Sequence, residues 1–129
     1  MNDRLKTGRA KEKELARQMC EYALIRCFWQ PPRAQYARVA DNTGQDVFGV
    51  YDFVGVDHQG AVVGVQVCRK RPGEIGIRRS KISMFCDLYQ PAMRAILASY
   101  DKAGFRLEEL QPSGEWRLIG LLPHEQETP

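Results

Sequence analysis

The clearest hydrophobic pattern in the chain consists of two apolar runs rich in β-branched residues, Val50–Val56 and Ala61–Cys68. A short polar segment, Asp57-His58-Gln59-Gly60, separates the two runs. Two such runs joined by a polar turn with Gly predict a β-hairpin. The second run is almost continuously apolar, which is typical of a central strand that is covered on both faces.

Two polar residues interrupt this hairpin: Asp52 in the first run and Gln66 near the end of the second. A polar group in an apolar strand is costly unless something pairs with it. A metal ion is one such partner, and a structural hydrogen bond is the other. The pattern alone leaves both open.

Apolar residues at helical spacing predict a first helix over Gly8–Ile25, with Ala16, Met19 and Ala23 on its buried stripe. Glu12 lies on the same stripe, so its carboxylate either needs a partner at the core or is solvated at the helix start. A simple ion pair with Arg9 or Arg38 would also explain it.

The remaining elements follow from shorter patterns. Pro and Gly between residues 71 and 79 predict a loop, and a second helix is expected over Ser80–Tyr89. A polar tail begins at His124. The expected fold is one α/β domain over residues 1–129, with an ordered core from about 8 to 121 and a mixed sheet flanked by helices. Its other strands are expected at Ala34–Ala40, Arg94–Tyr100, Phe105–Leu110 and Glu115–Leu121.

The composition is that of an ordinary globular domain, with 43% hydrophobic and 27% charged residues and a net charge of +3. No apolar run approaches the roughly 18 residues of a membrane span, and the polar N-terminus does not resemble a signal peptide. We therefore expect no membrane association and a cytoplasmic location, in a bacterial, archaeal or phage-encoded protein. The four cysteines form no Cys-x-x-Cys pair. They predict free buried thiols; a zinc site with His58 or His124 would need ligands from across the chain.

Positive charge gathers directly after the second apolar run. The segment from residue 69 to residue 81 contains six basic residues and a single acidic residue, Glu74. Such a run is either a solvated face or a surface that contacts phosphates. The six are Arg69, Lys70, Arg71, Arg78, Arg79 and Lys81.

If Glu12, Asp52 and Gln66 converge, they offer three oxygen ligands. Hard oxygen ligands suit Mg²⁺ or Mn²⁺. Such an ion can activate water and stabilise the charge that develops on a phosphate during hydrolysis.

The order of these motifs resembles the PD-(D/E)XK nuclease superfamily, and within it the archaeal-type Holliday junction resolvases. The matching stretches are a helix of the form Gly-x-x-x-Glu-x-Glu-Leu, a strand and loop with Arg and Gly, an Asp followed by apolar residues, and a strand that carries Glu-x-Lys in the family. In this chain the helix motif is Gly8–Leu15, and the strand and loop correspond to Arg38 with Asp41–Gly44. The Asp motif is Asp52–Val56, and Gln66-Val67-Cys68 stands where the family has Glu-x-Lys.

The resemblance implies a restriction-endonuclease-like fold, Mg²⁺- or Mn²⁺-dependent DNA cleavage, and a homodimer. It implies that Glu12, Asp52, Gln66 and the carbonyl of Val67 bind the metal, with Cys68 beside them. Asp46, six residues before Asp52, is either a further ligand beside the metal or a cap of the loop. The chain departs from the family where Gln66 replaces Glu and Cys68 replaces Lys. A thiol supplies no fixed positive charge near the attacking water. Lys70, two residues further on, is then the expected catalytic lysine, and Lys81 is another substitute. The residues expected to contact DNA are Arg38, Asn42, Arg69, Lys70, Arg71, Arg78, Arg79 and Lys81.

These departures leave a second hypothesis open. The chain could be a catalytically degenerate nuclease fold that binds nucleic acid or a protein partner without cutting. For a homodimer, the second helix or the C-terminal hairpin with Trp116 is the expected interface.

Overall fold

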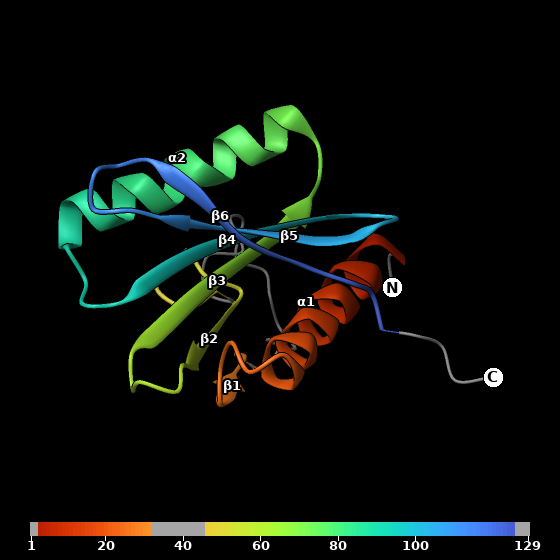
Figure 1. Cartoon of the computed structure of the whole chain (residues 1–129). Helices are drawn as coiled ribbons and strands as arrows, with labels where there is room; N and C mark the ends of the chain where they lie inside the picture. The colour runs from red at the N-terminus through yellow and green to blue at the C-terminus, as the bar shows by residue number, and fades with distance from the viewer. Residues whose placement is uncertain (1–2, 32–45, 126–129) are drawn as a thin grey trace.

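The computed structural model describes residues 3–31 and 46–125. These residues form a six-stranded mixed sheet in the order β1-β2-β3-β4-β5-β6, with α1 on one face and α2 on the other (Figure 1). Strands β3 and β4 are parallel, and the other four neighbouring pairs are antiparallel. The elements are α1 Asp3–Glu21, β1 Cys27–Trp29, β2 Phe53–Val56, β3 Val62–Arg69, α2 Pro72–Tyr89, β4 Arg94–Asp101, β5 Gly104–Leu110 and β6 Trp116–Leu122.

The central hairpin forms, but its first strand begins at Phe53 rather than at Val50, so Asp52 precedes the strand. Strands β2 and β3 pair around Asp57, whose carboxylate oxygen Oδ1 accepts hydrogen bonds of 2.9 Å from the N–H groups of Gln59 and Ala61. Gly60 completes the turn with a φ of 87°, a conformation that favours glycine. The hairpin places β3 beside β4 at the centre of the sheet, as the apolar run predicted.

The first helix is confirmed, but it begins and ends earlier than predicted. Leu15, Ala16 and Met19 are buried against the sheet. The helix ends at Glu21 because Ala23 adopts a left-handed φ of 61°, so Ala23 is exposed rather than part of the stripe. The strand expected at 34–40 falls outside the described residues, and β1 at Cys27–Trp29 pairs with β2 instead.

The loop predicted over residues 71–79 is wrong, because α2 already begins at Pro72. Proline is favourable in the first helical turn, where its missing N–H would have no intrahelical partner. Gly73 and Gly76 are therefore helical residues. Helix α2 ends at Tyr89. The next residue, Gln90, caps the helix: its backbone is in the left-handed conformation, and its N–H donates a hydrogen bond to the carbonyl of Cys86. This correction places Arg78 and Arg79 on the helix that was already expected to carry Lys81.

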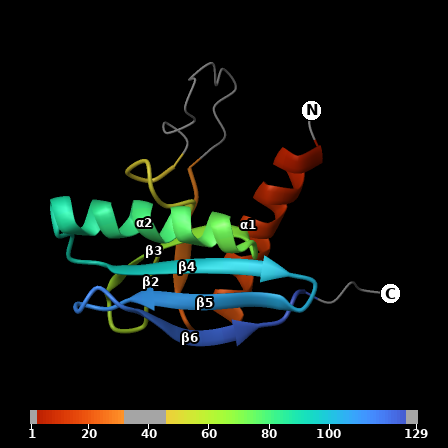
Figure 2. The ribbon, with the colours of Figure 1, turned by 90° about the horizontal axis from the view of Figure 1, so that it is seen from above.

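Two apolar clusters lie on opposite faces of the sheet. One contains Leu15 and Met19 of α1 with alternate residues of the strands, among them Val65 and Ile96. The other contains Ile82 of α2 with the intervening strand residues, among them Leu97. Figure 2 shows α2 lying along the sheet, with β4, β5 and β6 side by side. Neither helix in the described ranges combines the length and apolar character that crossing a membrane requires.

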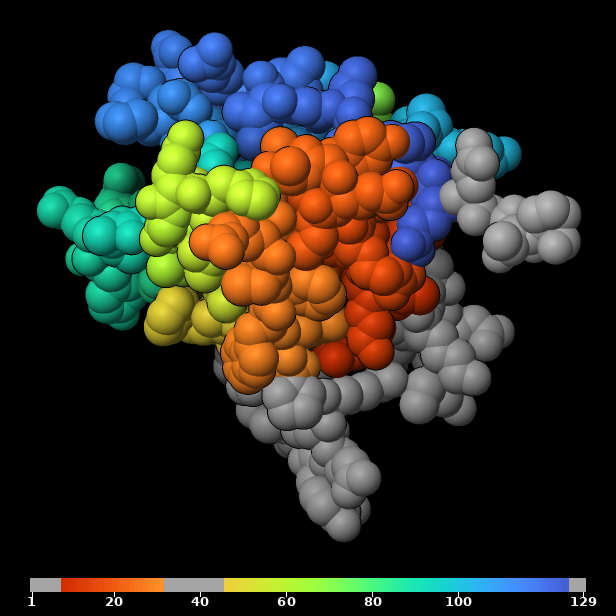
Figure 3. Space-filling model, turned by 60° about the horizontal axis from the view of Figure 1, so that its bottom comes forward, coloured from red at the N-terminus to blue at the C-terminus, as the bar shows by residue number. Residues whose placement is uncertain are grey.

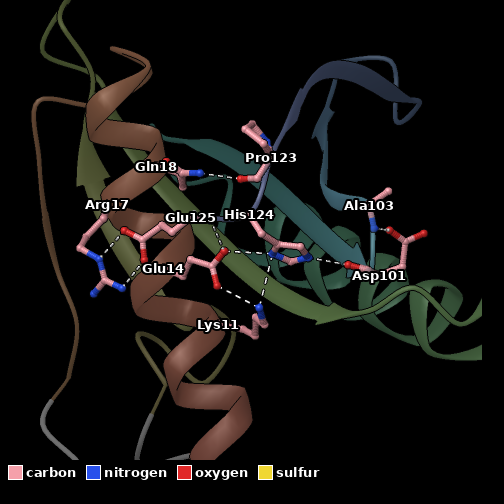
Figure 4. Close-up of polar contacts among 9 residues, drawn as sticks. All are labelled: Lys11, Glu14, Arg17, Gln18, Asp101, Ala103, Pro123, His124 and Glu125. Atoms are coloured by element: carbon pink, nitrogen blue, oxygen red, sulfur yellow. Dashed lines mark hydrogen bonds and ion pairs between the residues drawn. The ribbon is translucent and has the colours of Figure 1, made fainter. Parts of the chain in front are cut away.

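The end of the described chain is held on α1, which corrects the expectation of a polar tail from His124 on. Nδ1 of His124 lies 2.9 Å from Glu14 Oε2, and Nε2 lies 2.5 Å from the carbonyl oxygen of Asp101 (Figure 4). Glu14 also accepts hydrogen bonds from Lys11 and from the backbone of Glu125, each at 2.9 Å. These contacts join α1 to the end of β6 and to the turn after β4.

We expect Gly104→Ala to destabilise the domain by about 2–4 kcal/mol. Gly104 has a φ of 138°, and a Cβ atom there would lie 2.2 Å from the carbonyl oxygen of Leu122. Gly120→Ala is the matched control, because a Cβ at this β6 position meets no atom within 4 Å. Urea unfolding of both variants measures the difference, and equal midpoints would contradict the expectation.

Candidate functional site

A cleft of about 350 Å³ opens where β3 and β4 end and α2 begins. The carboxyl ends of parallel strands are a common place for ligand sites in α/β sheets. Two of the predicted metal ligands, Glu12 and Asp52, line the cleft together with basic residues at and after the end of β3. The lining residues are Gly8, Glu12, Asp52, Val67, Cys68, Arg69, Arg71, Glu74, Arg78 and Tyr100.

Asp52 is positioned by the β2–β3 hairpin. It lies directly before β2, and its own N–H donates to the carbonyl of Val65 at 2.8 Å. Its carboxylate oxygen Oδ2 accepts a 2.7 Å hydrogen bond from the N–H of Val67. Burial raises the pKa of Asp52 well above its ordinary value, and the nearby charge of Glu12 raises it further.

Glu12 reaches the same cleft from the other side, on α1. Its Oε1 accepts a 2.6 Å hydrogen bond from the amide Nε2 of Gln30. Burial raises the pKa of Glu12, while Arg9 and the hydrogen bond from Gln30 lower it. Gln30 is therefore the hydrogen-bond partner of this carboxylate among the described residues, and Arg9 acts on it through its charge.

Asp46 also lies near the two cleft carboxylates. Its negative charge contributes to the raised pKa of both Glu12 and Asp52. Its own pKa is raised by burial and lowered by Lys81, whose Nζ lies 3.9 Å from Asp46 Oδ2. The negative charges of Glu12 and Asp46 thus both act on Asp52, a repulsion that a bound cation would relieve.

Gln66 does not line the cleft. The side chain is completely buried on the face that α2 covers, and neither Oε1 nor Nε2 has a hydrogen-bond partner among the described residues. Cys68 lies on the same face, since alternate residues of a strand point the same way. Cys68 does border the cleft, and burial, followed by the charge of Glu74, raises the pKa of its thiol to about 11. The thiol is therefore protonated at neutral pH.

The lysine expected to replace the family lysine lies elsewhere. Strand β3 ends at Arg69. The side chain of Lys70 is directed to the end of β4, where its Nζ lies 3.7 Å from Oδ2 of Asp101. Among the lysines that the structure describes, Lys81 pairs with Asp46, the carboxylate near the cleft.

The basic residues divide between the cleft and the sheet. Arg69, Arg71 and Arg78 line the cleft. Arg79 forms an ion pair with the buried Glu108 of β5 and so holds α2 on the sheet. Arg38 and Asn42 lie outside the described residues.

Three cleft residues were not predicted from the sequence. Gly8 borders Glu12 on α1, Tyr100 closes the cleft from β4, and Glu74 enters from the first turn of α2. Glu74 Oε1 lies 3.8 Å from Arg78 Nη2. The one available signal was that Glu74 is the single carboxylate in an otherwise basic run.

The donor set of the cleft suits a hard divalent cation better than zinc. All four cysteines are free, but only Cys68 is buried as predicted; Cys20 and Cys86 are half-buried and Cys27 is exposed. Among the described residues no three His, Cys, Asp or Glu side chains lie close enough to form a metal centre as they stand. Mg²⁺, however, is often held by one or two carboxylates together with waters and substrate phosphates. Glu12 and Asp52 fit that mode.

Comparisons with known proteins add no relative: no protein-family model, no curated protein and no solved structure matches the chain.

We expect Asp52→Asn to stabilise the protein at pH 7 in the presence of a chelator, by on the order of 1 kcal/mol. The folded-state pKa of Asp52 is raised, so the folded protein favours its protonated form and loses stability as pH rises through that pKa. Asparagine removes the charge but can still accept the bond from Val67. The gain should shrink as pH falls toward 4.

Urea unfolding at pH 4 and pH 7 measures this gain. Glu115→Gln is the control, because Glu115 is exposed in the β5–β6 turn. A gain that is the same at both pH values would contradict the expected repulsion.

Proposed function

We propose that this chain is a metal-dependent DNA endonuclease of the PD-(D/E)XK type, with a restriction-endonuclease-like fold, that acts on branched DNA such as Holliday junctions. The observation that carries the proposal is the meeting of Glu12 and Asp52 in one cleft lined by Arg69, Arg71 and Arg78. The motif order in the sequence supports the same assignment.

Glu12 and Asp52 are the residues that would hold Mg²⁺ or Mn²⁺. Their raised pKa values reflect burial first and then neighbouring negative charge, which comes from Asp46 for Glu12 and from Glu12 and Asp46 for Asp52. A divalent cation would compensate both effects. The carbonyl of Val67, next to Asp52 in the cleft, is proposed as a further ligand. When bound, the ion would supply Lewis-acid activation of water and stabilise negative charge on the phosphate.

The arginines of the cleft would position the DNA backbone. Guanidinium groups bind phosphates through paired, charge-assisted hydrogen bonds. Arg71 also precedes the first turn of α2, where no side-chain cap occupies the helix N–H groups. That helix terminus adds positive potential to the same cleft. In the hydrolysis a water oxygen bonds to phosphorus, the ester P–O bond breaks, and the leaving oxygen takes up a proton.

Lys81 is our proposed substitute for the family lysine, in place of Lys70. Lys81 lies 3.9 Å from Asp46, whose charge acts on Asp52, whereas Lys70 pairs with Asp101. The ammonium group of Lys81 would act through Asp46. Its proposed role is therefore to position Asp46 and to balance the negative charge of the cleft carboxylates.

A second function is favoured by one observation. Gln66 is buried beneath α2 and Cys68 is a neutral thiol, so neither supplies the charge that the family uses at these places. The alternative is therefore a degenerate nuclease fold that binds nucleic acid or a protein partner without cleaving DNA.

We expect the purified protein to cleave a four-way DNA junction with Mg²⁺ or Mn²⁺, and Asp52→Asn to lower the rate by about 100-fold or more. Glu12→Gln should have a comparable effect, since both carboxylates are needed to hold the ion. Gel analysis of labelled junction and of linear duplex measures the rates, with Glu115→Gln as the control.

If wild type and Asp52→Asn are equally inactive, the nuclease proposal fails. Salt-dependent DNA binding that persists without cleavage and weakens in Arg71→Gln and Arg78→Gln would then support the alternative. Arg117→Gln, an exposed arginine on β6, controls for the loss of one positive charge.

We also propose that the protein is a homodimer, with α2 as the interface. Ile77, Met84 and Leu88 are 70%, 64% and 68% exposed. Their spacing along α2 places them on one apolar stripe. Trp116, by contrast, packs against the cluster beneath α2.

We expect Met84→Glu to weaken the dimer at least about tenfold, because a buried unpaired charge opposes association. Light scattering behind size-exclusion chromatography measures the mass over a range of concentrations. Leu121→Glu, at a position 69% exposed on β6, is the matched control. A monomeric wild type, or dissociation by Leu121→Glu alone, would contradict α2 as the interface.

A further inference from the structure

A second groove, of about 420 Å³, lies between α1 and β1. Figure 3 shows α1 and the segment that contains β1 side by side on this face. The α1 wall carries Arg9, Lys13 and Arg17, and the β1 wall carries Phe28 and Trp29. Gln30 and Pro31 complete the lining. The groove thus has a basic wall on α1 and an aromatic wall on β1.

The basic wall is a row along one helix face. Arg9, Lys13 and Arg17 are spaced by four residues, so they span about 12 Å of helix. Arg17 already forms two hydrogen bonds with Glu125, at 2.6 and 2.9 Å, and Arg9 donates one to the carbonyl of Pro31 at 3.2 Å. Lys13 forms no ion pair within the described ranges. The positive charge that the row offers to the groove therefore comes chiefly from Lys13, because Arg17 is paired with Glu125 and the charge of Arg9 also acts on Glu12.

The aromatic wall is exposed although it belongs to a strand. Trp29 is 56% exposed and Phe28 is 39% exposed. Phe28 packs edge-on against the buried Phe53, with ring centroids 6.1 Å apart, so it anchors β1 to the core. The ring of Trp29 is the more open of the two and is available for stacking.

Gln30 connects this groove to the cleft. It lines the groove, and its amide donates the 2.6 Å hydrogen bond to Glu12, which lines the cleft. A chain that follows the groove past Gln30 would arrive at the carboxylates. Only this connection rests on the proposed nuclease function; the ligand of the groove follows from its own walls.

We propose that the groove binds single-stranded DNA, with phosphates along α1 and a base stacked on Trp29. A positive row together with an exposed aromatic ring is the combination that binds single strands, because every base offers a flat face. A duplex keeps its bases stacked on one another and closed to Trp29. An acidic peptide would match the charges but leave the indole without a role.

The test measures binding of a labelled 12-nucleotide oligothymidine by fluorescence anisotropy, in EDTA so that no cleavage occurs. Trp29→Ala should weaken binding by about 5- to 100-fold. Tyr89→Ala is the matched control, since Tyr89 is a 71% exposed aromatic residue on α2. Lys13→Gln should reduce the slope of log K against log salt by about 0.7, and Lys102→Gln should not.

A second measurement observes the indole directly. The chain has two tryptophans, so Trp116→Phe leaves Trp29 as the single reporter. Oligothymidine should quench its emission, whereas a 12-base-pair duplex and a polyglutamate peptide should not.

Equal affinities of Trp29→Ala and Tyr89→Ala, absence of quenching, or the same Trp29 dependence for duplex or polyglutamate would overturn the proposal. These outcomes are separate from the cleavage assay. The dependence of metal-free binding on Trp29 and Lys13 tests the groove, and metal-dependent cleavage that is lost in Asp52→Asn tests the cleft.

Discussion

The parallel pairing of β3 and β4 is the constraint on which the rest of the structure depends. Parallel neighbours cannot be joined by a tight turn, so the chain must cross one face of the sheet, and α2 makes that crossing. With α1 on the opposite face, both sides of β3 are buried. The two strand ends and the start of α2 then meet at one place, which is where the cleft opens.

The same constraint decides which polar groups reach the cleft. Side chains alternate along β3, so Val65 packs beneath α1 while Gln66 is enclosed beneath α2. Leaving a buried polar group without a partner costs about 1–3 kcal/mol, and both polar atoms of Gln66 are in that state. Asp52 escapes this enclosure because it precedes β2 and turns its carboxylate to the N–H of Val67.

The electrostatics of the cleft are unfavourable for stability. Burial raises the pKa of Glu12, Asp46 and Asp52, and the charges of Glu12 and Asp46 raise the pKa of Asp52 further, while arginines line the same cleft. Conflicts of this kind are characteristic of sites that bind a ligand, since the ligand resolves them. Oxygen donors surrounded by guanidinium groups match a divalent cation together with phosphate, and the groove beyond Gln30 extends the positive surface along α1.

Local pattern was sufficient for much of this protein. The β2–β3 hairpin, the later strands, α1 and the mixed α/β architecture follow from periodicity and turn residues, which act over a few positions. The meeting of Glu12 and Asp52 in one cleft does not follow from local pattern; the order of the motifs suggested it only through the resemblance that this order carries. The sequence could not place Gln66, Lys70 or the start of α2. The burial of Gln66 depends on how α2 packs on the sheet. Lys70 pairs with Asp101, which lies at the end of the neighbouring strand β4. Pro72 indicates a helix break unless the helix that begins there is known. These outcomes are set by contacts between elements far apart in the chain, and only the tertiary structure decides them.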